Sequence, residues 1–127
     1  MKFQKFAIVL SLLLSTAAFA AGEGHSHGNA QPMHGGVVTE VKDIEYEFVA
    51  RADALQLYLR DHGKPVNITK ASAKVTMLSG GERQEVELKP TGDKLEAVGK
   101  FNTLVGTKIV VQVINTSKVA TVRFTLK

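Results

Sequence analysis

Ile44-Glu45-Tyr46-Glu47-Phe48 alternates apolar and charged residues one for one, and Leu55-Gln56-Leu57-Tyr58-Leu59-Arg60 repeats the pattern shortly afterwards. A period of two is typical of a half-buried β-strand, whose successive side chains point to opposite faces. We therefore expect Tyr46 and Phe48 to face a core and Glu47 to face water. A helix over residues 53–60 would spread the three leucines around its circumference, so a strand is the better interpretation.

The same alternation continues over most of the remaining chain. It is found at residues 71–77, 85–88, 95–97, 109–114 and 119–126, and it places Met77 in the core. Turn-forming residues separate these runs at 41–44, 51–54, 61–65, 79–82, 90–93 and 115–117. The pattern predicts an all-β fold, an immunoglobulin-like antiparallel β-sandwich of about eight strands over residues 36–127, behind a flexible arm at 21–35.

Residues 1–20 have the three parts of a secretory signal peptide. A short basic segment with Lys2 and Lys5 precedes the apolar run at residues 6–14, and Ala18-x-Ala20 matches a cleavage site. The apolar run is shorter than the ~20 residues that span a bilayer. We expect a cleaved leader, a periplasmic protein and no stable membrane insertion after cleavage; the alternative is an uncleaved N-terminal anchor.

The charge balance argues against a nucleic-acid partner. Without Lys2 and Lys5 the chain has 14 basic and 12 acidic residues, a net charge of +2, and no basic block. The chain also has no cysteine, which excludes thiolate metal sites and thiol redox chemistry.

The arm carries the residues with the clearest metal chemistry. His25, His27 and His34 lie within ten positions, among several glycines, and Met33 adds a thioether. Neutral imidazole binds copper, zinc and nickel, and thioether favours Cu(I). The alternative is a polar N-terminal linker in which histidine is merely tolerated.

His62, in Asp61-His62-Gly63, is a lesser candidate ligand. It would complete a coordination shell only if its loop and the arm lie at the same end of the domain; otherwise it is a loop-tip residue without a role. No Gly-x-Ser-x-Gly elbow or phosphate-binding glycine loop occurs. We therefore expect no enzymatic activity and no catalytic residues.

Two segments carry a family resemblance. Pro32-Met33-His34-Gly35-Gly36-Val37-Val38 and Leu57-Tyr58-Leu59-Arg60-Asp61-His62-Gly63-Lys64-Pro65-Val66 resemble the N-terminal domain of periplasmic adaptor subunits of heavy-metal RND efflux pumps. Small stand-alone periplasmic proteins share this pattern. The resemblance extends from Pro32 to the end and implies transition-metal binding, with His34 as the matched ligand. The coiled-coil hairpin and lipoyl-like motifs of a full adaptor are not in this sequence, so the expected part is the metal-handling module.

These observations predict a periplasmic transition-metal-binding protein, with copper or zinc as the preferred cation. It would buffer or deliver metal in heavy-metal resistance, and its expected partner is a component of a metal efflux pump. The predicted ligands are His34, His25 and His27, followed by Met33 and His62. The alternative is a non-enzymatic module that docks onto an envelope complex through a strand edge, with the arm as a spacer.

Overall fold

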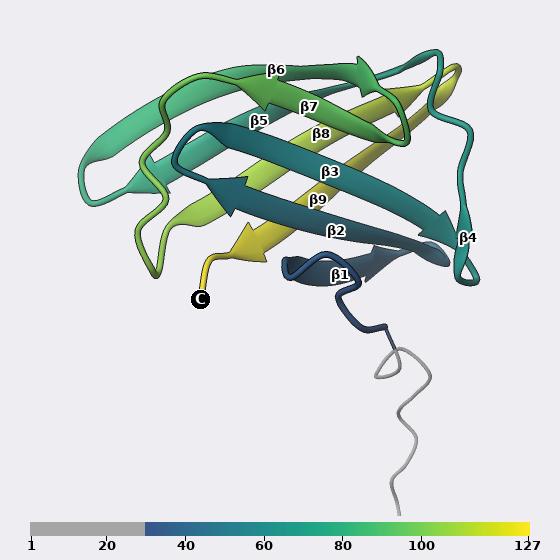
Figure 1. Cartoon of the computed structure of the whole chain (residues 1–127), viewed down its shortest axis with the longest axis horizontal. Coiled ribbons are helices and arrows are strands. Elements are labelled where there is room, and N and C mark those ends of the chain that lie inside the picture. Colours follow the sequence, from purple (N-terminus) through teal and green to yellow (C-terminus); the bar gives the residue numbers. More distant parts are fainter. Residues whose placement is uncertain (1–29) are drawn as a thin grey trace, which may run out of the picture.

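A computed structural model describes residues 30–127, and these residues form nine β-strands and no helix (Figure 1). The strands are β1 (Val37–Val41), β2 (Ile44–Arg51), β3 (Ala54–Asp61), β4 (Lys64–Pro65), β5 (Ala71–Ser79), β6 (Glu82–Thr91), β7 (Lys94–Val98), β8 (Lys108–Asn115) and β9 (Lys118–Thr125). Within residues 30–127, no helix is long and apolar enough to cross a membrane. The leader, His25 and His27 lie outside the described residues.

Two-residue turns join most successive strands, as the turn chemistry predicted. Lys42 and Asp43, between β1 and β2, have φ angles of 50° and 71°, and His62 and Gly63, between β3 and β4, have 53° and 83°. Two consecutive positive φ angles characterise the type I′ turn, whose twist matches that of the flanking strands. These short turns fix the register of the hairpins.

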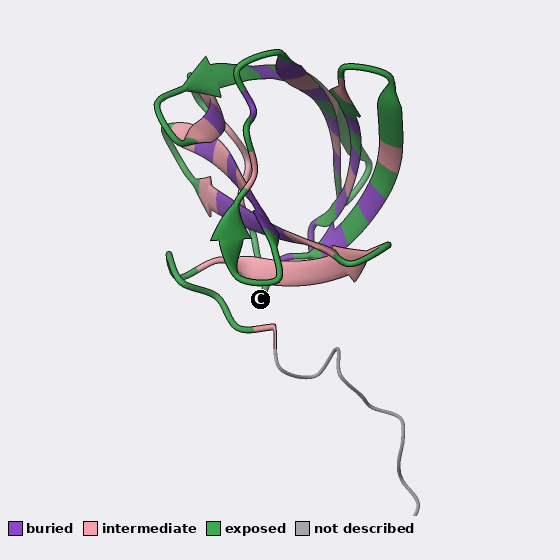
Figure 2. Cartoon of the chain, turned by 90° about the vertical axis from the view of Figure 1, so that its right-hand side faces the viewer, coloured by how far each residue is buried: buried purple, intermediate pink, exposed green. Residues whose placement is uncertain are grey.

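All neighbouring strands are antiparallel, in the order β1-β2-β3-β7-β6-β5-β8-β9, with β4 paired to β3. Strand β6 joins the two halves of the fold, because residues 82–88 pair with β5 and residues 89–91 pair with β7. The first and last strands of this order, β1 and β9, meet where the Thr39 hydroxyl donates to the Arg123 carbonyl oxygen at 2.9 Å. The result is a nearly closed, sandwich-like barrel (Figure 2).

The predicted all-β antiparallel architecture is confirmed. The strand count is nine rather than about eight because β4, a two-residue strand, was not expected. The core lies inside the barrel and consists of the inward residues of the alternating runs. The rings of Phe48 and Phe124 stack across it with centroids 5.4 Å apart, and Met77 is 2% exposed, as predicted.

One part of the outer surface departs from the alternating pattern. On β2 and β3, Glu47 and Arg60 point away from the core, yet both are buried. Residues 31–35 of the predicted arm, together with Gly36, cross this face and cover them. The prediction that Glu47 faces water is therefore wrong, because the segment before β1 forms a second layer there.

Candidate functional site

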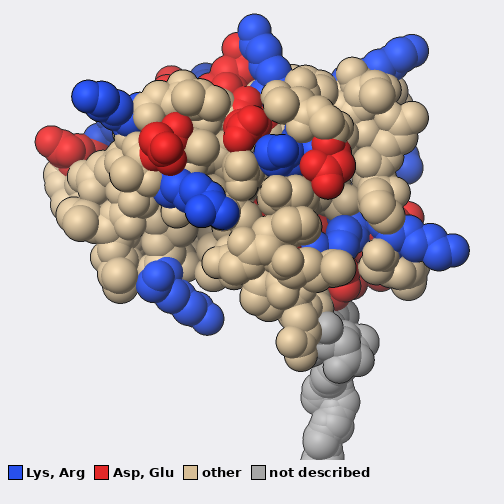
Figure 3. All heavy atoms as spheres, viewed as in Figure 1, with Lys and Arg blue, Asp and Glu red and all other residues tan. Residues whose placement is uncertain are grey.

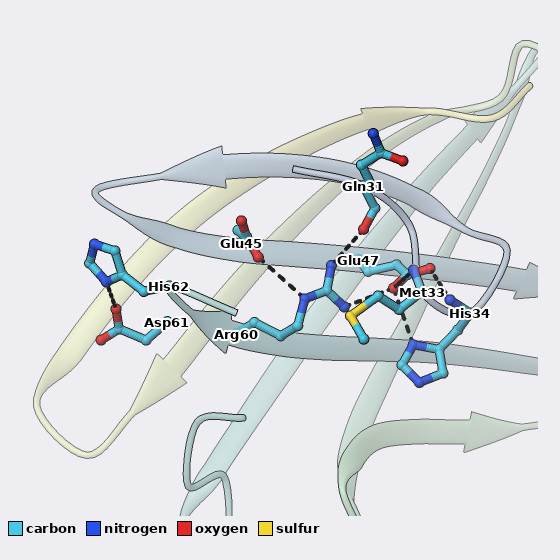
Figure 4. A network of polar contacts seen from close by, with 8 residues as sticks. All are labelled: Gln31, Met33, His34, Glu45, Glu47, Arg60, Asp61 and His62. Atoms are coloured by element: carbon cyan, nitrogen blue, oxygen red, sulfur yellow. Dashed lines mark hydrogen bonds and ion pairs between the residues drawn. The ribbon is translucent and has the colours of Figure 1, made fainter. Parts of the chain in front are cut away.

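The carboxylate of Glu47 is the centre of a polar network on the outer face of β2 (Figure 4). Its Oε1 accepts hydrogen bonds from the Met33 amide at 3.0 Å and from Nη1 of Arg60 at 3.0 Å, and it lies 3.1 Å from Nδ1 of His34. Its Oε2 accepts from the amides of His34 and Gly36 at 2.8 and 2.9 Å. One side chain thus binds three backbone amides of the segment before β1 and holds this segment against the barrel.

These contacts keep Glu47 ionised although its side chain is fully buried. Burial alone would raise the pKa of this carboxyl, because it disfavours the charged form. The amides of Met33, Gly36 and His34, together with the Arg60 guanidinium, outweigh burial and lower the pKa from 4.5 to about 2. Glu47 is therefore an anion, and a hydrogen-bond acceptor only, at any pH near neutrality.

Arg60 closes the network from β3. Its Nε donates to Glu45 at 3.3 Å, its Nη1 to Glu47, and its Nη2 to the carbonyl oxygen of Gln31 at 3.0 Å. The fork geometry of guanidinium allows one side chain to make all three bonds at once. Arg60 thereby connects both strands of the hairpin to the arm.

His34 is held in one orientation from two sides. Its ring stacks on Tyr58 of β3, with centroids 3.6 Å apart and planes 5° from parallel. Because the ionised Glu47 cannot donate, the contact at 3.1 Å requires the hydrogen on Nδ1 of His34. In the neutral ring, Nε2 then carries the free lone pair. Figure 4 shows this second nitrogen pointing away from the network, and the side chain is 36% exposed.

Gly36 allows the arm to approach this closely. A Cβ at position 36 would overlap the carbonyl oxygen of Phe48 and lie 2.9 Å from Cγ2 of Val49. Only glycine fits so near another backbone. The second glycine of the Gly-Gly pair after His34 is therefore required by packing. Its close approach to β2 determines where His34 lies.

The predicted ligands have different locations. Met33 is adjacent to His34 and 66% exposed, so its thioether is accessible. His62 lies in the turn after β3, where its Nδ1 is 2.6 Å from Asp61. It is four residues beyond the Tyr58 that stacks on His34, roughly 13 Å along an extended strand, and Figure 4 shows the two histidines at opposite ends of the network. Residues 30–35 of the arm and this loop therefore do not share a site.

Within residues 30–127, no three or more His, Asp or Glu side chains are arranged to hold a metal ion. His34 is thus a single oriented candidate ligand, and any further histidine ligand from the arm would come from residues before position 30. Figure 3 shows lysines, arginines and carboxylates interspersed on the face drawn.

Sequence reasoning missed Glu47 and Arg60. The available signal was the hairpin itself, because its antiparallel register pairs Glu45 with Arg60 and Glu47 with Tyr58. That register places the arginine beside both glutamates on one face, and such a cluster of opposite charges can be recognised in the sequence. The segment that covers this cluster cannot be recognised from the sequence.

Comparison with known proteins identifies no relative: no family model, no curated protein and no solved structure matches the chain.

Proposed function

We propose that this protein binds a transition-metal cation, copper or zinc by preference, through Nε2 of His34. The observation that carries the proposal is the Glu47–His34 pair. Histidines that ligate metals usually donate their other ring nitrogen to a carboxylate or carbonyl, which fixes the tautomer and orients the ring. His34 has this arrangement, and stacking on Tyr58 limits its rotation further.

The remaining ligands are proposed to come from the arm. His27 is seven residues before His34, and an extended chain of that length reaches up to ~24 Å; His25 lies two residues further away. Met33 is next to His34 and its exposed thioether would favour Cu(I). A site completed by a segment that must be ordered on binding suits reversible capture rather than permanent storage.

The setting we propose is the periplasm, as the leader at residues 1–20 suggests. There the protein would buffer metal or deliver it to a component of an efflux pump, in line with the resemblance to adaptor domains. We rank the docking module second, because the outer edges of β1 and β9 lie against each other and are joined by the Thr39–Arg123 hydrogen bond. Strand addition at either edge would have to open the barrel.

Calorimetric titration of the exported chain with Cu(II), Zn(II) and Ni(II) tests this function. We expect His34→Ala to weaken binding of the preferred metal by at least the ~10–100-fold typical of a lost metal-site group. A His25→Ala/His27→Ala double variant should weaken it as well. His62→Ala is the matched control and should bind like the unmodified protein. Equal weak binding by the unmodified protein and His34→Ala would overturn the proposal.

A further inference from the structure

A cavity of about 650 Å³ opens at the end of the barrel where three hairpin turns come together. These are the turns from β1 to β2, from β3 to β4 and from β8 to β9, and Figure 2 faces this end. The volume lies within the ~300–1,000 Å³ usual for small-molecule sites. The mouth of a small β-barrel is one of the places where such sites occur.

The inner part of this cavity is apolar apart from one hydroxyl group. Leu59 and Val113 line it together with the partly buried Ala120. Tyr46 lines it too and is only 5% exposed. Within residues 30–127 the Tyr46 hydroxyl has no hydrogen-bond partner, although buried hydroxyls usually have one. Burial also raises the pKa of Tyr46, so near neutral pH the group is an uncharged hydroxyl that can donate and accept a hydrogen bond.

The rim carries charges of both signs. Lys42 and Lys118 lie there together with Asp43 and Asp61, and His62, which also lines the cavity, is paired with Asp61. Two cations beside two anions give no strong preference for a ligand of either charge, whereas the apolar interior favours burial of an uncharged body.

We propose that this cavity binds an uncharged, mainly apolar small molecule with one hydrogen-bonding group, which pairs with the Tyr46 hydroxyl. The apolar body lies between β2–β3 on one side and β8–β9 on the other. The site is separate from His34, which lies on the outer face of the sheet, whereas Tyr46 faces the interior. It therefore does not depend on the proposed metal function.

The fluorescent probe N-phenyl-1-naphthylamine tests this site, because it is uncharged, apolar and carries a single N–H. The chain has no tryptophan, so the probe signal is read without interference. We expect a saturable increase in fluorescence with one probe per chain. Tyr46→Phe keeps the ring and should weaken binding ~3–10-fold, the usual worth of one net hydrogen bond.

Two further variants separate the cavity from the surface. Ala120→Leu adds volume at the cavity wall and should reduce probe affinity at least tenfold. Thr121→Leu, on the exposed face of the same strand, should leave affinity unchanged, and so should His34→Ala. Amide chemical shifts confirm that each variant is folded and should show probe-induced changes at the β2, β3 and β8 ends of the cavity. The absence of saturable binding, or equal affinity in Ala120→Leu, would overturn the proposal; unchanged affinity in Tyr46→Phe would overturn the role of the hydroxyl.

Discussion

Residues 30–127 contain two histidine–carboxylate pairs, which differ in exposure and in the number of hydrogen-bond donors around the carboxylate. His62 and Asp61 are neighbours in a turn, 2.6 Å apart, with side chains 79% and 54% exposed. His34 and Glu47 are 3.1 Å apart, and the Glu47 side chain is fully buried. The His34–Glu47 contact is longer, but it matters more for the structure. The Glu47 carboxylate accepts from four further hydrogen-bond donors and has no access to water. Distance alone is therefore a poor guide to what a histidine can do.

The largest expected difference between the pairs is in stability. Glu47→Gln removes the charge that compensates the buried Arg60, and breaking a buried pair in this way costs ~3–5 kcal/mol. We expect urea denaturation to show a loss of that size in the free energy of unfolding. The loss should be accompanied by faster amide exchange at residues 33–36, whose N–H groups bind this carboxylate.

Asp61→Asn is the matched control for this measurement. It also neutralises the carboxylate of a histidine pair, but in an exposed turn where water replaces the lost contact. Its unfolding curve should overlay that of the unmodified protein. Equal destabilisation by the two variants would contradict the distinction between the pairs.

A second difference is expected in acid. The pKa of Glu47 is about 2 in the folded chain against an ordinary value of 4.5, so the folded state binds this proton less readily than the unfolded state. The resulting stabilisation is complete above pH 4.5 and is lost as the pH falls through 2. The difference between the folded and the ordinary pKa of Glu47 corresponds to about 3 kcal/mol in the free energy of unfolding.

The comparison of the unmodified protein with Glu47→Gln isolates this contribution. The difference in their free energies of unfolding should be constant from pH 7 to about pH 5 and should shrink steadily below it. Chemical denaturation at a series of pH values measures both curves. A difference that stays constant down to pH 2 would show that the charge of Glu47 does not hold the arm.

The sequence predicts the strands but not the layer over them. Alternation in residues 44–48 and 55–60 correctly places Tyr46, Phe48 and the leucines inside, because the two faces of a strand follow directly from its period. The same alternation assigns Glu47 to water, since charged residues on an outer face are usually solvated. It cannot show that backbone amides of residues 33, 34 and 36 supply the donors, because every residue except proline has an amide.

The resemblance to adaptor domains pointed to His34 without giving a physical reason for it. The proposed ligand is supported by contacts between His34 and Glu47, 13 positions apart in the chain, and by the stacking on Tyr58; the ligand role of His34 itself stays a prediction. His25 and His27, selected only by their spacing, remain predictions.

The smallest expected effect concerns the titration of His62. The hydrogen bond and charge of Asp61 raise the pKa of His62 above its ordinary 6.5, and Asp43 and Glu40 add to the effect. Asp61→Asn should lower this pKa toward 6.5, as followed through the ring nitrogen shifts of His62 in a pH titration. Because a raised histidine pKa stabilises the fold only at pH values below it, any contribution is present in mild acid and disappears as the pH rises through that pKa.

His34 in the same spectra supplies the internal reference. Its Nδ1 should show the shift of a protonated nitrogen even when the ring is neutral, because the Glu47 carboxylate can only accept. The Asp61 carboxylate also favours the hydrogen on Nδ1 of His62, but water competes for this contact in the exposed turn. The Nε2-protonated tautomer should therefore contribute more to the shifts of His62 than to those of His34. A neutral His34 ring with its hydrogen mainly on Nε2 would show that Glu47 does not orient His34, and the proposed metal ligand would lose its physical basis.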